Sequence, residues 1–560
     1  MLIDILAASA IKFLLSLSIL APDFILSRKF VFTNKRSAFR YFLSSLILTI
    51  PVFFSGMNFS TVAILTLSFL IISAWHVNYR YFGEVLGPDS LALLVKPDHF
   101  RDVVSVGFDE VRTFVPTLSV VALCLVVSIY LVSWSPDHDF QWWSSVLAWL
   151  VLIGAGLRMA LRRRARHDYP KLHMPGLFGG LHALALAVKW GFTLPKTLQG
   201  AVKYSMQPAR DALVIVLMGE SINPARMGLF SGLDTTPRID AIMAGAGPSR
   251  GAAKTGFSAA VASNSSVVGF LSGSPFPWHT EGSRSLFNLA RSQGFATRYW
   301  SGQAGSPVDV LGDKEAIDDI HCLENAPESF GARKDWHLLD RLNERPFGDR
   351  EFALLYPRCN HAPFHCHDPN ASRHAPNRKI SDIFEHYDAG MRVFDAFASD
   401  LIEHLQKDGR RFFLFITSDH NEMLSDRDGL RGHSLSGQAI GAFVPHLLLT
   451  NDPESDVFRD FSTQTTPTAW SVVELVLRIM GVKATVEPAL DTKYVGNSLP
   501  FCKAGHMRVW GDDSPFRVDN YDRAGTLQGS KEFSKEHWLG MYRRPVQPQP
   551  AAEQLKAEAL

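Results

Sequence analysis

The chain has 560 residues, of which 46% are hydrophobic and 20% are charged, and its formal net charge is +1. Because a domain usually has about 100–200 residues, this length indicates more than one domain. The near-neutral charge argues against a nucleic-acid-binding protein, which needs a basic surface. The 39 Phe, 12 Trp and 12 Tyr residues argue against a largely disordered chain.

The first third of the chain is poor in charge. Residues 1–161 contain 11 of the 56 Lys and Arg residues and 10 of the 55 Asp and Glu residues. Five apolar stretches in this region approach the length of about 17–25 residues that a membrane span requires. We therefore predict an all-α transmembrane bundle of five helices over 1–161, rather than the buried helices of a soluble bundle. The stretches are 3–26, 39–55, 59–77, 115–134 and 143–161.

Basic residues give one indication of the topology. Cytoplasmic loops of membrane proteins are rich in Lys and Arg. With five spans, the basic residues between 28 and 40 and those between 162 and 166 lie on the same side as the C-terminal region. Charge alone therefore favours a cytoplasmic C-terminal domain.

The C-terminal region has the pattern of an α/β domain. Residues 162–210 are interpreted as a helical linker at the membrane surface, and the Pro- and Gln-rich residues 543–560 as a disordered tail. Between them, strands alternate with helical patterns, which indicates an α/β sandwich with a mainly parallel sheet over 211–542. Three continuous apolar runs are typical of strands buried on both faces of such a sheet: 212–221, 411–420 and 443–450.

Two of these runs end in candidate metal ligands. Glu220 lies at the end of the first run, and Asp419 and His420 lie at the end of the second. Ligands of open parallel sheets bind beyond the carboxyl ends of the strands, so these three side chains are expected to converge. A carboxylate and an Asp–His pair, with a fourth position left for a nucleophile, suit Zn²⁺. His361 and His433 also follow possible strand ends, whereas most of the 20 His residues must be structural or solvated.

Six segments of the C-terminal region resemble a known family. In their order along the chain they are similar to the alkaline phosphatase/sulfatase superfamily, and specifically to membrane-anchored phosphoethanolamine transferases, which include the lipid A-modifying enzymes of polymyxin resistance. Five preceding membrane spans also match the layout of that family. The segments are GESINPARMGLFSG (219–232), RYWSGQ (298–303), NHAPF (360–364), YDAGMRVFD (387–395), TSDHNE (417–422) and GH (432–433).

The resemblance implies a zinc site with Glu220, Asp419 and His420 as ligands. In the family, a nucleophilic Thr about forty residues beyond the Glu completes the site. The pattern Gly-Val-x-Thr-x-x-Ser, laid on SAAVASNSSVVGFLSG (258–273), places Ser263 at the Thr. Ser263 is therefore expected to be both nucleophile and metal ligand.

This chain departs from the family pattern at several positions. Ala260 stands at the Gly of the nucleophile pattern, Val268 replaces the usual Pro, and Asn421 replaces the usual Gly. Three further serines lie close to Ser263 and remain alternative nucleophiles: Ser258, Ser265 and Ser266.

The reaction implied by the resemblance has two steps. Ser263 attacks phosphatidylethanolamine and releases diacylglycerol, and an envelope glycan or lipopolysaccharide, at lipid A or the core, then accepts the phosphoethanolamine. His361 and His433 would hydrogen-bond the phosphoryl group or an additional metal, or would protonate the leaving alkoxide. Glu110, in a loop with Glu84 and Asp109, would bind the ammonium headgroup or would simply be a solvated surface charge.

Two other classes of function remain open. One is a phosphoglycerol transferase or a hydrolase of the phosphodiesterase or sulfatase type. A sulfatase is disfavoured because no Cys-x-Pro-x-Arg or Ser-x-Pro-x-Arg motif lies near Ser263. The other is a non-catalytic membrane protein that has kept the fold and lost the nucleophile.

The resemblance also implies a location in the bacterial inner membrane, with several spans and the catalytic domain in the periplasm. This conflicts with the charge count. We adopt the periplasmic location, because basic residues at the interface can instead bind anionic headgroups or acceptor phosphates. In that compartment Cys359 and Cys366 could form a disulfide, although the four cysteines of the domain allow three pairings.

Overall fold

The computed structural model has two compact units: residues 1–196 with 426–432, and residues 197–425 with 433–560. Each unit is described by itself, and every statement below refers to the residues that the structure describes. These are 2–26, 42–43, 45–47, 49–50, 52–53, 58–82, 111–133, 141–160, 177, 179–181, 183–185, 201–245, 248–275, 284–303, 306–311, 313–323, 335–361, 383–424, 431–432, 439–487, 493–496, 505–521 and 526–542.

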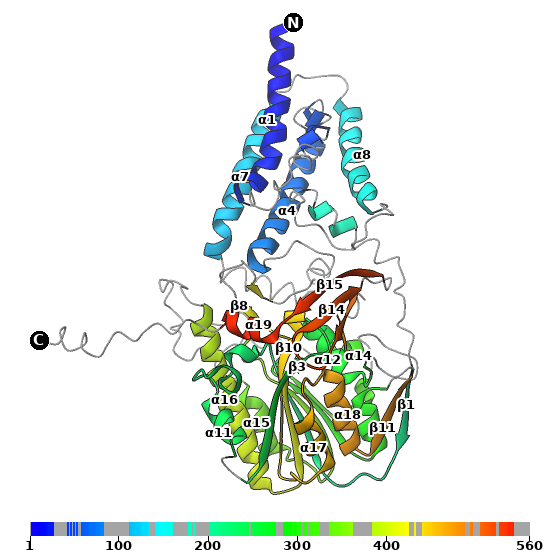
Figure 1. Ribbon diagram of the computed structural model, residues 1–560. Coiled ribbons are helices and arrows are strands. Elements are labelled where there is room, and N and C mark those ends of the chain that lie inside the picture. The colour runs from blue at the N-terminus through cyan, green and yellow to red at the C-terminus, as the bar shows by residue number, and fades with distance from the viewer. Residues whose placement is uncertain are drawn as a thin grey trace, which may run out of the picture. The chain divides into compact units, whose positions relative to one another are not determined.

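The first unit is helical where it is described. Its long helices are α1 (Leu2–Leu26), α4 (Phe59–Phe82), α7 (Val111–Ser133) and α8 (Gln141–Ala160) (Figure 1). Ile19, Phe69, Val121 and Leu152, one from each helix, are buried in a shared core. The hydroxyls of Ser18 and Ser128 also join α1 to α7 at 2.6 Å.

The prediction of five membrane spans is not confirmed. Among the described residues, one helical stretch, Phe59–His76, is long and apolar enough to cross a membrane. Two shorter apolar stretches are Ala10–Pro22 and Thr117–Ser133. Four of the five predicted stretches fall on the four long helices, and 39–55 is described in short helical pieces. The five-span arrangement therefore stays a prediction.

The second unit is built on a seven-stranded mixed sheet. Its strand order is β3-β10-β7-β2-β6-β4-β5 (Figure 1). Strands β7, β2, β6, β4 and β5 are mutually parallel, as predicted for most of the sheet. Their bounds are β2 (Leu213–Gly219), β4 (Ala296–Ser301), β5 (Asp319–Cys322), β6 (Glu351–Tyr356) and β7 (Phe412–Ser418), and β3 (Arg250–Phe257) and β10 (Phe443–Thr450) complete the sheet.

The direction of β10 corrects the sequence interpretation. The apolar run 443–450 was expected to be a parallel strand, but β10 pairs antiparallel with both β7 and β3. All eight residues of β10 are buried. A continuous apolar run indicates that a strand is buried on both faces of a sheet. Parallel and antiparallel strands can be buried in this way equally well, so the run does not predict the strand direction.

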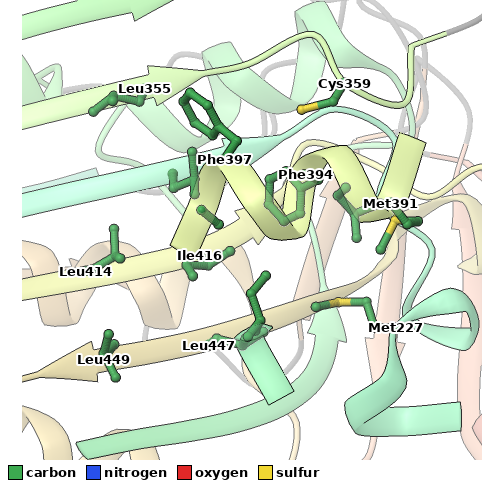
Figure 2. Close-up of a cluster of buried hydrophobic side chains, with 14 of the residues drawn as sticks. Met227, Leu355, Cys359, Met391, Phe394, Phe397, Leu414, Ile416, Leu447 and Leu449 are labelled. Atoms are coloured by element: carbon green, nitrogen blue, oxygen red, sulfur yellow. The ribbon is translucent and has the colours of Figure 1, made fainter. Parts of the chain in front are cut away.

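Helices cover both faces of this sheet, so its side chains alternate between two cores. Ile215 and Leu217 of β2 belong to one core with Phe397 of α16, while Val214 and Val216 belong to the other with α13 and α18. Figure 2 shows the first core, in which Phe394 and Phe397 of α16 pack above Leu414 and Ile416 of β7. The principal helices are α11 (Pro237–Met243), α12 (Ser263–Leu271), α13 (Leu286–Ser292), α14 (Ser306–Leu311), α15 (Trp336–Glu344), α16 (Ile383–Asp408), α17 (Asp456–Thr463), α18 (Ala469–Ile479) and α19 (Lys535–Tyr542).

Smaller elements complete the second unit. An antiparallel sheet of four strands has the order β12-β13-β14-β15, and β1 pairs with β11. Residues 201–206, which the sequence interpretation placed in a helical linker, thus form a strand that is paired within this unit. The bounds are β1 (Ala201–Met206), β8 (Met423–Leu424), β9 (Arg431–Gly432), β11 (Val482–Glu487), β12 (Lys493–Gly496), β13 (His506–Trp510), β14 (Phe516–Tyr521) and β15 (Leu527–Phe533), with a helical turn α10 (Gly228–Ser231) and 3-10 turns at Pro224–Arg226, Lys314–Ala316 and Ala439–Ala442.

Candidate metal centre

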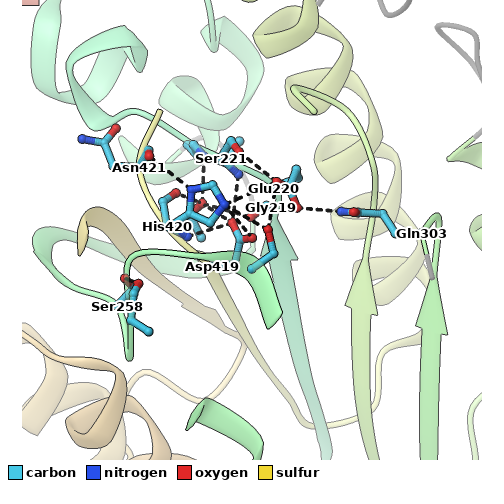
Figure 3. A network of polar contacts seen from close by, with 12 residues as sticks. Gly219, Glu220, Ser221, Ser258, Gln303, Asp419, His420 and Asn421 are labelled. Carbon is cyan, nitrogen blue, oxygen red and sulfur yellow. Dashed lines mark hydrogen bonds and ion pairs between the residues drawn. The ribbon is translucent and has the colours of Figure 1, made fainter. Parts of the chain in front are cut away.

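Polar side chains gather beyond the carboxyl ends of four neighbouring parallel strands. Glu220 follows β2, Asp419 and His420 follow β7, Tyr356 is the last residue of β6, and Gln303 follows β4. Parallel strands end at the same edge of a sheet, so this topology brings together residues that are far apart in the sequence. Figure 3 shows the resulting network around His420.

The three predicted metal ligands do converge. Glu220, Asp419 and His420 are 0% exposed, and one ligand atom of each lies within 4.8 Å of the others. His420 Nε2 is 3.5 Å from Glu220 Oε1 and 3.3 Å from Asp419 Oδ2. A tetrahedral zinc ion with bonds of about 2.0–2.2 Å separates its ligand atoms by about 3.3–3.6 Å. Both distances from His420 Nε2 therefore match the spacing of such a ligand set.

Ser263 completes the cluster. It is the first residue of α12, and its Oγ lies 3.0 Å from His420 Nε2 and 3.4 Å from Glu220 Oε1. Unlike the three buried candidate ligands, Ser263 is half-buried. The backbone N–H groups in the first turn of a helix favour negative charge, which suits a phosphoryl group at this position.

Hydrogen bonds orient both carboxylates. Asp419 Oδ1 accepts from the backbone N–H of Ser221 at 2.9 Å and from that of His420 at 2.8 Å. Glu220 accepts from the Gln303 amide at 2.7 Å and from the Ser221 hydroxyl at 2.8 Å. Tyr356 lies between the two acids, with its hydroxyl 2.8 Å from Asp419 Oδ2 and in contact with Glu220 Oε2.

The two buried carboxylates of the cluster favour a positive charge beside them. Burial, and next the charge of Glu220, raise the pKa of Asp419 to about 6. Burial would lower the pKa of His420, but Asp419 and Glu220 outweigh it and raise that pKa to about 10. Two carboxylates in a dry site repel each other unless a positive charge lies between them. The buried carboxylate and imidazole donors thus fit a divalent metal ion, and Zn²⁺ in particular accepts this mixture of ligands.

The alternative serines stand in other environments. The Ser258 hydroxyl donates to the Ala260 carbonyl at 2.7 Å, and Figure 3 shows it apart from the His420 network. Ser265 and Ser266 are buried within α12. Of the four serines, Ser263 is the one whose hydroxyl meets Glu220 and His420.

The remaining candidates are only partly described. His361 is half-buried. Burial alone would raise the pKa of Glu220, but the hydrogen bond from His420 and next the charge of His361 hold that pKa well below its usual range. His433 and Glu110, and with it Glu84 and Asp109, lie outside the described residues. Cys359 is a free, buried thiol, and Cys366, with which it could pair, lies outside the described residues. Burial, and next Asp335, raise the pKa of the Cys359 thiol.

Two members of the network were missed by sequence reasoning. Tyr356 ends the apolar run that precedes His361, and Gln303 ends the segment RYWSGQ. Both follow the same rule of strand ends that identified Glu220 and Asp419. They were not selected as candidates because tyrosine and glutamine are seldom metal ligands.

Similarity to known proteins is found among solved structures. No family model and no curated protein matches the sequence. Among solved structures, the integral membrane protein lipooligosaccharide phosphoethanolamine transferase A from Neisseria meningitidis has 16% identity and a TM-score of 0.50, over 85% of this chain and 96% of that chain. The C-terminal periplasmic domain of EcEptC from Escherichia coli, in complex with Zn, has 15% identity and a TM-score of 0.44, over 54% of this chain and 94% of that one. The phosphonate monoester hydrolase of Agrobacterium radiobacter has 13% identity and a TM-score of 0.40, over 62% and 94%.

The chain therefore has an alkaline-phosphatase-like fold with a mixed sheet. Its resemblance to membrane-anchored phosphoethanolamine transferases is confirmed at the level of the fold, across both units of the chain.

Proposed function

We propose that this protein transfers phosphoethanolamine from phosphatidylethanolamine to an envelope glycan or a lipopolysaccharide, through a covalent intermediate on Ser263. Zn²⁺ would be held by Glu220, Asp419, His420 and Ser263. The observation that carries the proposal is the position of Ser263 Oγ, within 3.0–3.4 Å of two candidate metal ligands at the first turn of α12.

The side chains of the site supply most of the chemistry. A serine hydroxyl is a weak nucleophile at neutral pH, and a bound metal ion would lower its pKa and polarise the phosphoryl oxygen. In the first step, Ser263 Oγ forms a bond to phosphorus as the bond to the diacylglycerol oxygen breaks. His361 and His433 are the proposed carriers of the proton, which leaves Ser263 Oγ and is delivered to the departing diacylglycerol oxygen.

The second step restores the enzyme. An acceptor hydroxyl or phosphate oxygen attacks the same phosphorus, the bond to Ser263 Oγ breaks, and Ser263 Oγ regains a proton, which a hydroxyl acceptor supplies as it loses its own. Gln303 and Tyr356 hold the carboxylates of Glu220 and Asp419 in place throughout, so that the ligand atoms need not rearrange between the two steps.

A lipid donor explains why a phosphotransferase would carry an apolar N-terminal unit. Large apolar side chains on three of its helices point outward, with Leu70 61% exposed, Leu123 65% and Leu150 59%. Such a surface suits contact with lipid. We propose an inner-membrane location with the catalytic unit in the periplasm. Fusion of an alkaline phosphatase reporter to the C-terminus would be active there, and an inactive fusion would favour the cytoplasmic side.

The experiment that tests the function uses the zinc-loaded, full-length protein and phosphatidylethanolamine labelled in its acyl chains. We expect diacylglycerol to be released and phosphoethanolamine to be found on the tryptic peptide that contains Ser263. Ser263→Ala should abolish both signals and retain the metal, whereas Ser263→Thr should keep turnover because it retains a hydroxyl. Ser266→Ala, in the same helix, is the matched control.

Other outcomes separate the alternatives. Turnover of phosphatidylglycerol in place of phosphatidylethanolamine would indicate a phosphoglycerol transferase. Release of free phosphoethanolamine with a saccharide acceptor present, and none on the acceptor, would indicate a hydrolase. Absence of all turnover in a metal-loaded protein would favour a non-catalytic membrane protein.

A further inference from the structure

Asp335 is a buried acid that takes no part in the proposed reaction. It is 6% exposed and stands at the start of α15, where an aspartate ordinarily accepts a hydrogen bond from the first N–H groups of its own helix. Its side chain makes no such bond. A buried carboxylate needs hydrogen-bond donors to offset the hydration that it has lost, so the donors that Asp335 does have indicate its role.

Those donors belong to the loop after β6. Asp335 Oδ1 accepts from the backbone N–H of Arg358 at 2.8 Å, and Asp335 Oδ2 accepts from that of Cys359 at 2.9 Å. Figure 2 shows Cys359 on the loop that continues from the strand of Leu355. The two oxygens of one carboxylate thus bind two successive residues, which fixes the direction of the loop as well as its position.

The same two residues begin the tight turn that leads to His361. The His361 N–H donates to the Arg358 carbonyl at 3.0 Å, and Asn360 has a φ of 74°. A hydrogen bond between the first and fourth residues, with a positive φ at the third, is the geometry of a type II turn. The third position favours glycine or asparagine, and Asn360 meets that requirement. His361 is therefore the last residue of a turn with a defined conformation.

Helix α16 packs against this turn. Asn360 is 1% exposed, and its Nδ2 lies 2.8 Å from Met391 Sδ. A Cβ on Gly390 would stand 2.1 Å from Asn360 Oδ1, so the close approach depends on the glycine. The turn is thus held by Asp335 through its backbone and by α16 through the side chain of Asn360.

Asp335 also lies against the segment that carries Gln303. A Cβ on Gly302 would stand 2.4 Å from Asp335 Oδ1 and 3.0 Å from the backbone nitrogen of Arg358. The next residue, Gln303, donates to Glu220 at 2.7 Å. The turn of His361 and the metal centre are therefore supported by the same piece of structure.

The position of His361 matters for the metal centre. After burial and the hydrogen bond from His420, the charge of His361 has the largest effect on the pKa of Glu220. The proposed reaction also gives His361 a proton to carry. A proton carrier must come within about 2.6–3.2 Å of the reacting atom, so the backbone from which its imidazole extends must be fixed.

We propose that Asp335 is a positioning residue, which holds the type II turn of residues 358–361 and so keeps His361 beside the metal centre. The part that His361 plays in catalysis rests on the proposed function, whereas the support of the turn by Asp335 does not.

The first test measures diacylglycerol release from phosphatidylethanolamine by the zinc-loaded, full-length protein. Asp335→Asn fills the same volume, but an amide has one acceptor oxygen and turns its NH₂ group toward the second N–H. A misplacement of about 1 Å can cost about 100-fold in rate, so we expect kcat to fall about tenfold or more, with little change in KM.

A double substitution shows whether Asp335 acts through His361. In the His361→Ala background, Asp335→Asn should lower kcat by less than about twofold, because residues that act through one another are not additive. Asp395→Asn is the matched control, since Asp395 likewise accepts from two successive backbone N–H groups, those of Arg238 and Ile239, but at the start of α11. It should leave kcat unchanged.

Asn360 separates the conformation of the turn from the packing of a side chain. Asn360→Gly retains the positive φ without strain, whereas Asn360→Ala retains more of the side chain but disfavours that φ. We expect kcat of the glycine variant to exceed that of the alanine variant about fivefold or more. The opposite order would overturn the proposal, and this pair decides it if Asp335→Asn does not fold.

Amide hydrogen exchange tests the turn without any turnover. The N–H groups of Cys359 and His361 should exchange about tenfold faster or more in Asp335→Asn, while those of β7 are unchanged. Equal exchange in the variant and the original protein would overturn the proposal even if diacylglycerol is released. A loss of kcat that persists in full in the His361→Ala background would also overturn it. Faster exchange in a protein that releases no diacylglycerol would support the role of Asp335 in the turn and reject the transferase.

Discussion

The hydroxyl of Tyr356 donates to Asp419 Oδ2 at 2.8 Å, and the same oxygen contacts Glu220 Oε2. A phenol carries a single proton and can satisfy one carboxylate at a time. Burial, and next the charges of Asp419 and Glu220, raise the pKa of Tyr356 well above its usual range, so it keeps that proton at neutral pH. Tyr356 therefore positions the two acids without changing their charge.

Replacing Tyr356 by Phe should weaken metal binding without unfolding the protein. Phe fills nearly the same volume, but the carboxylates lose the group that orients them. Loss of such an outer partner commonly costs about 10–100-fold in metal affinity. A competition titration with a zinc chelator would measure the change. Tyr299→Phe, in the core on the neighbouring strand β4, is the matched control, and equal affinity in the two variants would contradict the positioning role.

Gly219, the last residue of β2, lies close to Phe394 of α16. A Cβ at this position would stand 2.6 Å from Ile222 Cγ1 and 3.0 Å from Phe394 Cε2. We expect Gly219→Ala to shift Glu220, to reduce the zinc content and to destabilise the protein by about 1–3 kcal/mol, as overpacking usually does. Gly529→Ala meets nothing within 4 Å and should be neutral. Thermal unfolding and metal analysis would compare the two variants, and identical behaviour would refute the prediction.

Removing the metal should destabilise the second unit. Without the metal, only a protonated His420 offsets the repulsion between Glu220 and Asp419, which have no exposure to water. Bound zinc at one hundred times its Kd would add about 2.7 kcal/mol, so chelation should lower the Tm by several degrees. Asp419→Asn removes the repulsion as well as a ligand, and its Tm should respond little to chelation. A Tm that does not change on chelation of the original protein would argue against a metal at this site.

His446 should make the protein less stable in mild acid. Burial lowers the pKa of its ring to about 3, against an ordinary value of about 6.5. Between these two values the unfolded chain binds more protons than the folded one, so stability rises with pH. At pH 5 the penalty from this residue is about 2 kcal/mol relative to pH 8. His446→Gln should shrink the difference in unfolding free energy between pH 8 and pH 5 by that amount, and an unchanged difference would show that His446 titrates normally.

The candidate ligands were predictable because their signal is local. Glu220 ends one continuous apolar run and Asp419 and His420 end another, and the edge of a parallel sheet brings such positions together. Ser263 was found by resemblance to a family pattern, since a serine in a serine-rich stretch carries no signal of its own. The structure then distinguishes it from Ser258 by the direction of its hydroxyl.

The sequence by itself determined which segments are buried, because a run such as 212–218 is apolar at every position and must be shielded from water on both faces. It also determined which polar residues stand where those runs stop. The tertiary structure alone decided that β10 runs against β7, that Tyr356 and Gln303 join the metal centre, and that Asp335 meets the loop after β6. Each of these depends on contacts between residues far apart in the chain, and the pattern of apolar and polar residues along a chain does not specify which distant segments meet.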